Sequence, residues 1–190
     1  APAVITYFAK NVDSVIDMTA AVLDELEAAA VRLFPAWLPE AEGIAGPQGA
    51  GASAVRTLAL RRGATTRHFG HFLAYLAERA LARAETRLLE RAETAPAGRG
   101  RCATGFAPEV RAAGLARVLA AGYGREQAAI LVQVPAGLSP VAEEVLVAGC
   151  EWLAHRGGFG VWLTGAPLLA TDRVTAVPVR LPAELAGLVR

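Results

Sequence analysis

Hydrophobic positions along the chain follow two patterns: short apolar runs typical of strands, and one-sided apolar faces typical of helices. The runs are rich in β-branched and aromatic residues and predict four strands: Val4–Ala9, Ala129–Val134, Phe159–Thr164 and Val174–Leu181. The one-sided faces predict helices over residues 12–34, 53–62, 68–93, 108–121 and 140–155, and a short helix that begins at Pro182. Because proline has no N–H group, Pro178 places the last strand at an edge of the sheet.

Two of the predicted helices have faces that can be assigned residue by residue. In the helix over residues 12–34, we expect Asn11 to be the cap and Pro35 to end the helix. The apolar face of this helix comprises Val12, Val15, Ile16, Thr19, Val22, Leu23, Leu26, Ala30 and Leu33. Its other face carries the charged residues Asp13, Asp17, Asp24, Glu27 and Arg32. In the helix over residues 68–93, the residues predicted to point inward are Phe69, Phe72, Leu73, Leu76, Leu81, Leu88 and Leu89.

The order of these elements predicts the fold class. Strands of six to eight residues separated by a helix favour parallel pairing with a right-handed crossover. We therefore expect a single α/β domain over residues 1–190, with a three-layer, mostly parallel sheet flanked by helices. Its parts are an N-terminal strand and helix (1–42), a glycine loop with helices (43–93), a linker (94–105) and an α/β tail (106–190).

Composition and charge narrow the classes of function. The chain has 19 basic and 18 acidic residues, a net charge of +1, so no electrostatic footprint for nucleic acid is expected. Its apolar segments are interrupted well before the roughly 18 residues that a membrane span needs, and the apolar residues 1–9 are too short for a signal peptide. Cys102 and Cys150 have no metal or redox spacing, which indicates a reducing cytoplasm. Lys10 is the only lysine, a bias typical of a GC-rich bacterial genome.

Residues 46–53, GPQGAGAS, follow the phosphate-binding pattern G-x-x-x-x-G-K-[ST] with one change. Gly46, Gly49 and Gly51 could let backbone N–H groups close around phosphates, and Ser53 could meet Mg²⁺. Ala52 stands where the pattern has its lysine, so the loop has no cation of its own. The preceding residues 37–45 lack the buried apolar run that normally leads into such a loop. A glycine- and alanine-rich surface turn is the alternative interpretation.

The order of the motifs resembles the nucleotide-binding core of STAND-type P-loop NTPases. A glycine loop and helix are followed by the apolar strand Ile130–Val134, then by a strand that ends in Thr164-Gly165-Ala166-Pro167 and is similar to the sensor segment of that family. The resemblance covers residues 43 to 182. It implies a nucleotide-binding fold, with Gly46, Gly49, Gly51, Ala52, Ser53 and Thr164 as the binding residues. The cofactor stays open, with ATP or another nucleotide and its Mg²⁺ as candidates.

The departures from the family pattern all remove charged groups that nucleotide hydrolysis would need. Ala52 replaces the lysine, the strand that ends at Val134 carries no carboxylate, and Ala166 occupies the place of the sensor arginine. Phosphoryl transfer depends on positioning and on electrostatic stabilisation of a highly charged transition state. If the resemblance holds, the chain is a pseudo-NTPase with no catalytic or metal-ligating residues.

Other candidate residues have simpler structural interpretations. His68 and His71 could share a helix face toward a metal, but no third ligand is near them in the sequence. Glu143 and Glu144 could supply a base near a strand end, although carboxylates in the first turn of a helix are stabilising by themselves. Trp37 is either a surface anchor for a partner or an aromatic plug between helices.

Three functions follow from these observations. The first is a catalytically degenerate NTPase-like domain that acts as a binding or scaffolding module in a bacterial cytoplasmic system, with a protein or a second copy of the chain as its partner. The second is a residual nucleotide-binding switch or weak NTPase with a non-standard P-loop, in which Lys10, Arg61, Arg62 or Arg125 replaces the absent lysine. The third is an unrelated small-molecule enzyme with its site at the carboxyl ends of the strands.

Overall fold

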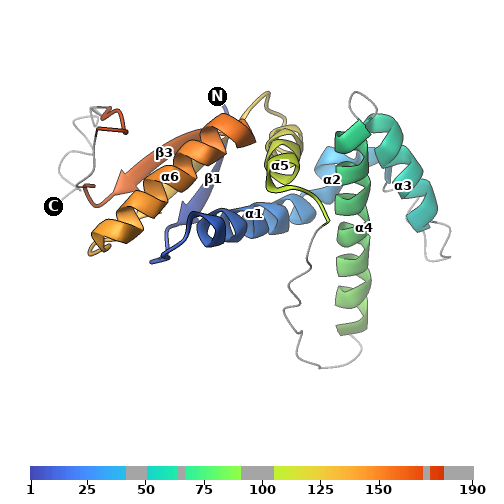
Figure 1. Ribbon diagram of the computed structural model, residues 1–190. Helices are drawn as coiled ribbons and strands as arrows, with labels where there is room; N and C mark the ends of the chain where they lie inside the picture. The colour runs from blue at the N-terminus through green and yellow to red at the C-terminus, as the bar shows by residue number, and fades with distance from the viewer. Residues whose placement is uncertain (42–50, 64–66, 91–104, 169–171, 178–190) are drawn as a thin grey trace, which may run out of the picture.

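The computed structural model describes residues 1–41, 51–63, 67–90, 105–168 and 172–177 (Figure 1). The elements, in chain order, are β1 (Ala3–Phe8), α1 (Val15–Arg32), α2 (Phe34–Trp37), a 3₁₀ turn η1 (Pro39–Ala41), α3 (Gly51–Arg62), α4 (Arg67–Glu90), α5 (Pro108–Gly122), β2 (Ala128–Val134), α6 (Pro140–Gly157) and β3 (Gly160–Gly165). The α/β character is thus confirmed, and the first three predicted strands form close to their expected bounds.

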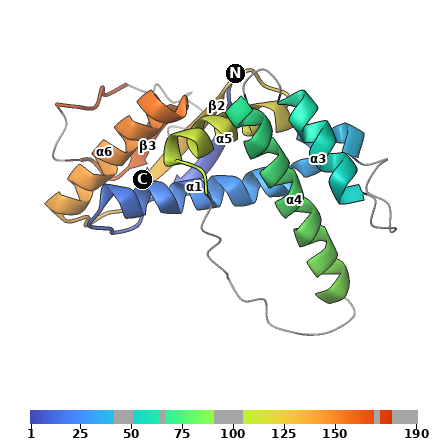
Figure 2. The same cartoon turned by 45° about the vertical axis from the view of Figure 1, so that its right-hand side comes forward.

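The three strands form one parallel sheet in the order β1-β2-β3. Because the chain moves across the sheet in one direction, right-handed crossovers place the connecting helices on the same face. Figures 1 and 2 show α1, α5 and α6 together on one side of the strands, and these helices contact β1, β2 and β3 respectively. The described residues therefore form two layers, where three layers were predicted.

The core lies between the sheet and these three helices. Tyr7, Ile130 and Val132 point into it from the strands, and all three are buried. The helices contribute a larger buried set, which includes Met18, Val22, Leu26, Leu115, Leu119, Leu146 and Leu153. Helices α1 and α6 approach so closely that a Cβ atom on Gly149 would overlap the sulfur of Met18. This close approach explains why α6 carries a glycine in its middle.

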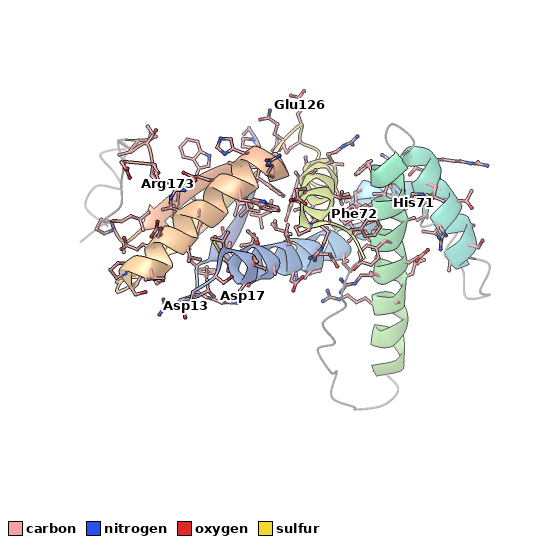
Figure 3. The ribbon with its side chains drawn as sticks, viewed as in Figure 1. Asp13, Asp17, His71, Phe72, Glu126 and Arg173 are labelled. Carbon is pink, nitrogen blue, oxygen red and sulfur yellow. The ribbon has the colours of Figure 1, made fainter. Side chains whose placement is uncertain are left out.

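Helices α2, α3 and α4 extend away from the sheet (Figure 2). Helix α3 packs along α4 and against η1, and α4 reaches back to α1 and α5. Phe72 on α4 points toward α5, where it packs on Gly114 (Figure 3). Trp37 is buried and donates a hydrogen bond of 2.7 Å from Nε1 to the Ala30 carbonyl, so it is the aromatic plug between helices.

The N-terminal helix differs from its prediction in its start and in its buried face. Helix α1 starts at Val15, and the Oγ of Ser14, not Asn11, accepts from the Ile16 N–H at 3.2 Å. The chain stays extended past β1, because the Ala9 N–H still donates to the Gln133 carbonyl. Ile16, predicted to be inward, is 78% exposed. Glu27, predicted to lie on the outer face, is 1% exposed, because α4 and α5 cover a second side of α1.

The prediction for the C-terminal strand is wrong over its first half. Residues 174–177 are described and form a bend and irregular structure, with no ladder to β3. Residues 178–181, the helix predicted from Pro182, Cys102 and nearly all of the linker 94–105 lie outside the described residues. Among the inward positions predicted for α4, Phe72, Leu73 and Leu76 are buried, and Phe69 and Leu81 are partly buried. The side chains of Leu88 and Leu89 lie outside the described part of the chain.

Candidate functional site

The residues predicted to bind a nucleotide do not gather at one place. Gly51, Ala52 and Ser53 form the first turn of α3, and Thr164 lies near the end of β3. Both views place α3 and β3 at opposite ends of the molecule (Figures 1 and 2). Gly46 and Gly49 lie outside the described residues. The described residues before the loop are helical, with α2 and η1 where a P-loop would follow a strand.

Three of the four cations proposed to replace the lysine lie away from this turn or are already paired. Arg61 and Arg62 are in the last turn of α3, roughly 12 Å along the helix axis from Ser53 at 1.5 Å per residue. The guanidinium of Arg62 donates to both carboxylate oxygens of Glu40, and Lys10 pairs with Glu25 at 3.2 Å.

The other candidate residues do not assemble a reactive centre in the described part of the chain. His71 is exposed on α4, and the side chain of His68 is outside the described residues. Within the described ranges, no group of three His, Cys, Asp or Glu side chains could hold a metal ion. Glu143 is buried and Glu144 exposed in the first turn of α6, which Ser139 caps by accepting from the Ala142 N–H. Burial raises the pKa of the Cys150 thiol to about 12, so this thiol is unreactive near neutral pH.

The structure instead gathers uncharged side chains on the face of the sheet that no described helix covers. Paired residues of neighbouring strands share a face, and the register aligns Val4 with Ala129 and Gly160, and Thr6 with Leu131 and Trp162. We call this surface the open face; it comprises Val4, Thr6, Phe8, Ala129, Leu131, Gln133, Gly160, Trp162 and Thr164.

Three large apolar side chains of the open face are accessible. Val4 is 56% exposed, Phe8 is 68% exposed, and Trp162 is 55% exposed. Val4 and Phe8 lie on β1, which is one outer strand of the sheet, and Trp162 lies on β3, which is the other outer strand. Leu131 and Gln133 on the central strand are half-buried, and Ala129 is buried. An aromatic pair on the two outer strands of an uncharged surface is the composition of an interface core rather than of a reactive site.

A hollow of about 880 Å³ adjoins the open face beside β3. The hollow spans the outer edge of β3: Trp162 and Thr164 line it from the open face, and Leu163 lines it from the helix-covered face. Cys150 and Ala154 of α6 also line it, and residues 173–177 form part of its wall. Arg173 is part of this wall: its Nε donates to Glu151 Oε1 of α6 at 2.9 Å, and its Nη2 donates to Glu151 Oε2. The hydrogen bond from Arg173 lowers the pKa of Glu151, and the same bond raises the pKa of Arg173. Figure 3 shows Arg173 at the end of the molecule formed by β3 and α6.

The end of β3 is fixed by the neighbouring strand. Gly165 has a φ of +114°, a conformation that favours glycine, and a Cβ atom there would overlap the Val134 carbonyl. The Ala166 N–H donates to the same carbonyl at 3.0 Å. The Thr-Gly-Ala-Pro segment that suggested a sensor therefore has a structural role, which is to turn the chain off the sheet beside the hollow.

A second cluster of polar groups lies where helices α1, α4 and α5 meet, away from the open face. Glu27 of α1 accepts from Arg111 Nη2 of α5 at 2.9 Å and from the Tyr75 hydroxyl of α4 at 3.0 Å, and it pairs with Arg79 of α4. Arg111 also donates to Asp24 at 2.9 Å. The cluster joins three helices, and sequence spacing missed it because its members are 84 and 48 residues apart.

Comparison of the chain with known proteins found no family model that matches it, no curated protein and no solved structure. Among the described residues, no helix is both long and apolar enough to cross a membrane. The sequence did not predict the open face, because Val4, Phe8 and Trp162 are apolar positions of the kind expected to be buried in a strand. The available signal was one polar residue of this face on each otherwise mostly apolar strand, namely Thr6, Gln133 and Thr164.

Proposed function

We propose that this chain is a binding or scaffolding module of a bacterial cytoplasmic system, a degenerate NTPase-like domain that holds a protein partner on its open face. The observation that carries the proposal is the exposure of Val4, Phe8 and Trp162 on one uncharged sheet surface. Large apolar patches on soluble domains mark interaction sites, and parallel sheets almost always have both faces covered.

The energetics favour a partner at this surface. Covering about 100 Å² of a half-exposed aromatic side chain is worth about 2.5 kcal/mol at 25 cal/mol per Å². Phe8 and Trp162 together would then contribute about 5 kcal/mol before the costs of association. Exposed Trp and Phe side chains are also the types that dominate measured interface energies.

To test whether a protein binds at the open face, Trp162 is replaced by a photo-reactive phenylalanine in cells that express the chain, and the cross-linked products are identified. The matched control carries it at Ile16, an apolar residue on the outer side of α1 that is more exposed than Trp162. We expect a distinct protein adduct from position 162 that is absent from position 16 and is lost on Phe8→Asp. Equal adducts from both positions would contradict the proposal.

The residual nucleotide switch is the alternative, and the exposed Ser53 in the first turn of a twelve-residue helix supports it. The melting temperature is measured with and without millimolar Mg²⁺-ATP, Mg²⁺-GTP and Mg²⁺-ADP. A ligand at 100 times its dissociation constant adds about 2.7 kcal/mol, which such a scan resolves. The binding-module proposal expects no shift. A shift of several degrees that is lost on Ser53→Ala would favour the switch.

A further inference from the structure

We infer that the hollow beside β3 receives an extended segment of the protein partner, which pairs with β3 as a fourth strand of the sheet. The inference rests on the proposed function and names the conformation and the chemistry of the partner at this place. It follows from the unpaired backbone groups of β3, from the position of α6 beside the hollow, and from the pairing of the charged side chains around it.

The outer edge of β3 carries backbone groups that have no partner in the described part of the chain. The described strands have the order β1-β2-β3, so β3 is paired on one side. On that side the Ala166 N–H donates to the Val134 carbonyl, and successive residues of a strand direct their N–H and C=O groups to alternate sides. Val161 and Leu163 therefore direct both groups to the outer edge, where no hydrogen bond between described residues uses them. Such a row of donors and acceptors is the template with which an added strand pairs.

The hollow lies where a fourth strand would run. It borders β3 on both faces of the sheet, since Leu163 points to the helix-covered face and Trp162 to the open face. Helix α6 lines its inner side with residues at helical spacing: Val147, Cys150, Glu151, Ala154 and His155. The helical layer therefore already extends over the position of the next strand, as it does over β1, β2 and β3.

Nothing in the sequence of β3 itself blocks the addition of a strand. Residues Gly160–Gly165 include no proline and no charged residue, two of the means by which natural sheets prevent pairing at an edge. Residues 173–177 form the opposite wall, but they and β3 line a hollow of about 880 Å³, and residues 174–177 form no ladder with β3. The described chain thus borders this edge without occupying it.

The charged side chains around the hollow already satisfy each other. Arg173 donates two hydrogen bonds to the Glu151 carboxylate, and His155 Nδ1 lies 2.9 Å from the Glu151 carbonyl oxygen. The hollow therefore offers no uncompensated charge to a small ionic ligand. The edge of β3 offers two donors and two acceptors, on Val161 and Leu163, at the spacing of an extended backbone. This chemistry favours a strand.

A single extended segment fits this edge better than a second copy of the chain does. The β3 strand of a second copy would bring its own α6 and its own residues 173–177 to the edge, where the same elements of the first copy already lie. A segment of a partner can enter alone between α6 and the wall. The hollow also continues into the open face at Trp162 and Thr164, so one partner can contact both surfaces.

The two faces of the sheet define the side chains of the added segment. Alternate side chains of a strand point to opposite faces, so every second residue of the segment would meet Val147, Cys150 and Ala154 of α6. A charge at these positions would lose its hydration without gaining an ion pair. We therefore expect small or apolar residues there, and no proline at the residues whose N–H groups face β3.

The first test is amide hydrogen exchange of the full chain, followed by NMR. The N–H groups of Val161 and Leu163 should exchange about tenfold or more faster than those of Trp162 and Thr164, which face β2. Slow exchange at all four positions would show that the edge is already covered in the isolated chain. That result would overturn the inference and assign the edge to the chain's own residues.

The second test uses a display library of peptides of about eight residues without proline, selected on the full chain. A selected peptide is synthesised again with N-methyl groups at alternate residues, in two versions that differ in which residues are methylated. Only every second N–H group of an added strand faces β3, so one version should bind about tenfold or more weakly and the other should bind nearly unchanged. Binding should also slow the exchange of the Val161 and Leu163 amides. Equal effects of the two versions, or no selected peptide, would exclude a strand.

A pair of variants tests the same edge from the side of the chain. Leu163→Pro removes a donor at the outer edge and no ladder bond to β2, whereas Leu163→Ala shortens the side chain and keeps the donor. Peptide binding should be lost on Leu163→Pro and kept on Leu163→Ala, and equal binding by both would contradict the inference. Circular dichroism checks that each variant is folded. If Leu163→Pro does not fold, the methylated peptides decide the question.

Two further outcomes would overturn the inference while separating it from the proposed function. A dimer seen by light scattering, in which the Val161 and Leu163 amides exchange slowly, would assign the edge to a second copy. A photo-adduct at position 162 without any peptide binding at β3 would leave the proposed function standing and remove only the added strand.

Discussion

The two faces of the sheet are built from alternate residues of the same three strands, and neither carries a charged residue, yet they have opposite environments. On the helix-covered face, Tyr7, Ile130 and Val132 are buried. On the open face, Phe8 and Trp162 keep more than half of their surface accessible. The difference shows that the apolar character of a strand sets its potential for burial, while the layer packed against it sets which residues are buried.

The largest expected effect comes from the charge cluster that joins α1, α4 and α5. Glu27→Ala leaves Arg111 buried without its main partner, and breaking a buried pair costs about 3–5 kcal/mol. Urea unfolding followed by circular dichroism measures the loss. Asp24→Ala is the matched control, because Asp24 pairs with the same guanidinium from a largely exposed position. The double variant Glu27→Met, Arg111→Met should lose less than Glu27→Ala alone, and an equal loss would contradict this account of the cluster.

A direct comparison of the two faces uses one truncation on each. Ile130→Ala removes a fully buried side chain and should lower the free energy of unfolding by about 2–4 kcal/mol. Trp162→Ala removes a larger side chain from the open face and should cost less than about 1 kcal/mol in the isolated chain. The same urea series measures both. A loss on Trp162→Ala as large as that on Ile130→Ala would mean that the open face is covered within the isolated chain.

Thiol chemistry separates the two faces kinetically. In a Cys102→Ser background, Cys150 should react with a disulfide reagent at pH 8 far more slowly than a cysteine introduced by Thr164→Cys, since the pKa of Cys150 is raised to about 12. The raised value also predicts a stability that is complete below the usual thiol pKa and falls as the pH rises toward 12. Absorbance of the released reagent gives both rates. Equal rates would contradict the burial of Cys150 on the inner side of α6.

The smallest effect is expected at the wall of the hollow. Arg173→Ala removes the ion pair with Glu151, but both side chains are well exposed, so the melting temperature at neutral pH should stay within error. Because the pKa of Glu151 is lowered, any contribution of the pair is present above the usual carboxyl pKa and is lost as the pH falls through the lowered value. Melting of both proteins at pH 7 and pH 3 measures it. A shift of several degrees at pH 7 would show that residues 173–177 stabilise the fold.

Local sequence patterns predicted most of the elements but not their partners. Helices α5 and α6 and strands β1, β2 and β3 lie within a few residues of their predicted bounds, because the strands are short apolar runs and both helices begin at a proline. The strand predicted over residues 174–181 was wrong where it is described, since strand formation needs a neighbouring edge and not only β-branched residues. Glu27 was placed outside because a single helix period cannot show that two other helices cover its second side.

The candidate site also combines features that local sequence patterns predicted with contacts that they did not. The glycine loop was recognised from a local sequence pattern, but α3, which carries Ser53, and β3, which carries Thr164, lie at opposite ends of the molecule. Their order in the sequence therefore did not make these two residues neighbours. The open face was hard to recognise in the sequence, because most of its residues are apolar or small and its polar members Thr6, Gln133 and Thr164 lie one on each strand. Only the register brings Phe8 and Trp162 onto one surface.

The sequence by itself determined the α/β class, the parallel strands and the near-neutral, alanine-rich helices, because these depend on residue type and spacing along a few turns. The tertiary structure decided which face of the sheet is covered, that Glu27 is buried beside Arg111, and that α3 lies far from β3. These features depend on contacts between residues that are tens of positions apart. Chain direction and helix packing set such contacts, and no local pattern encodes them.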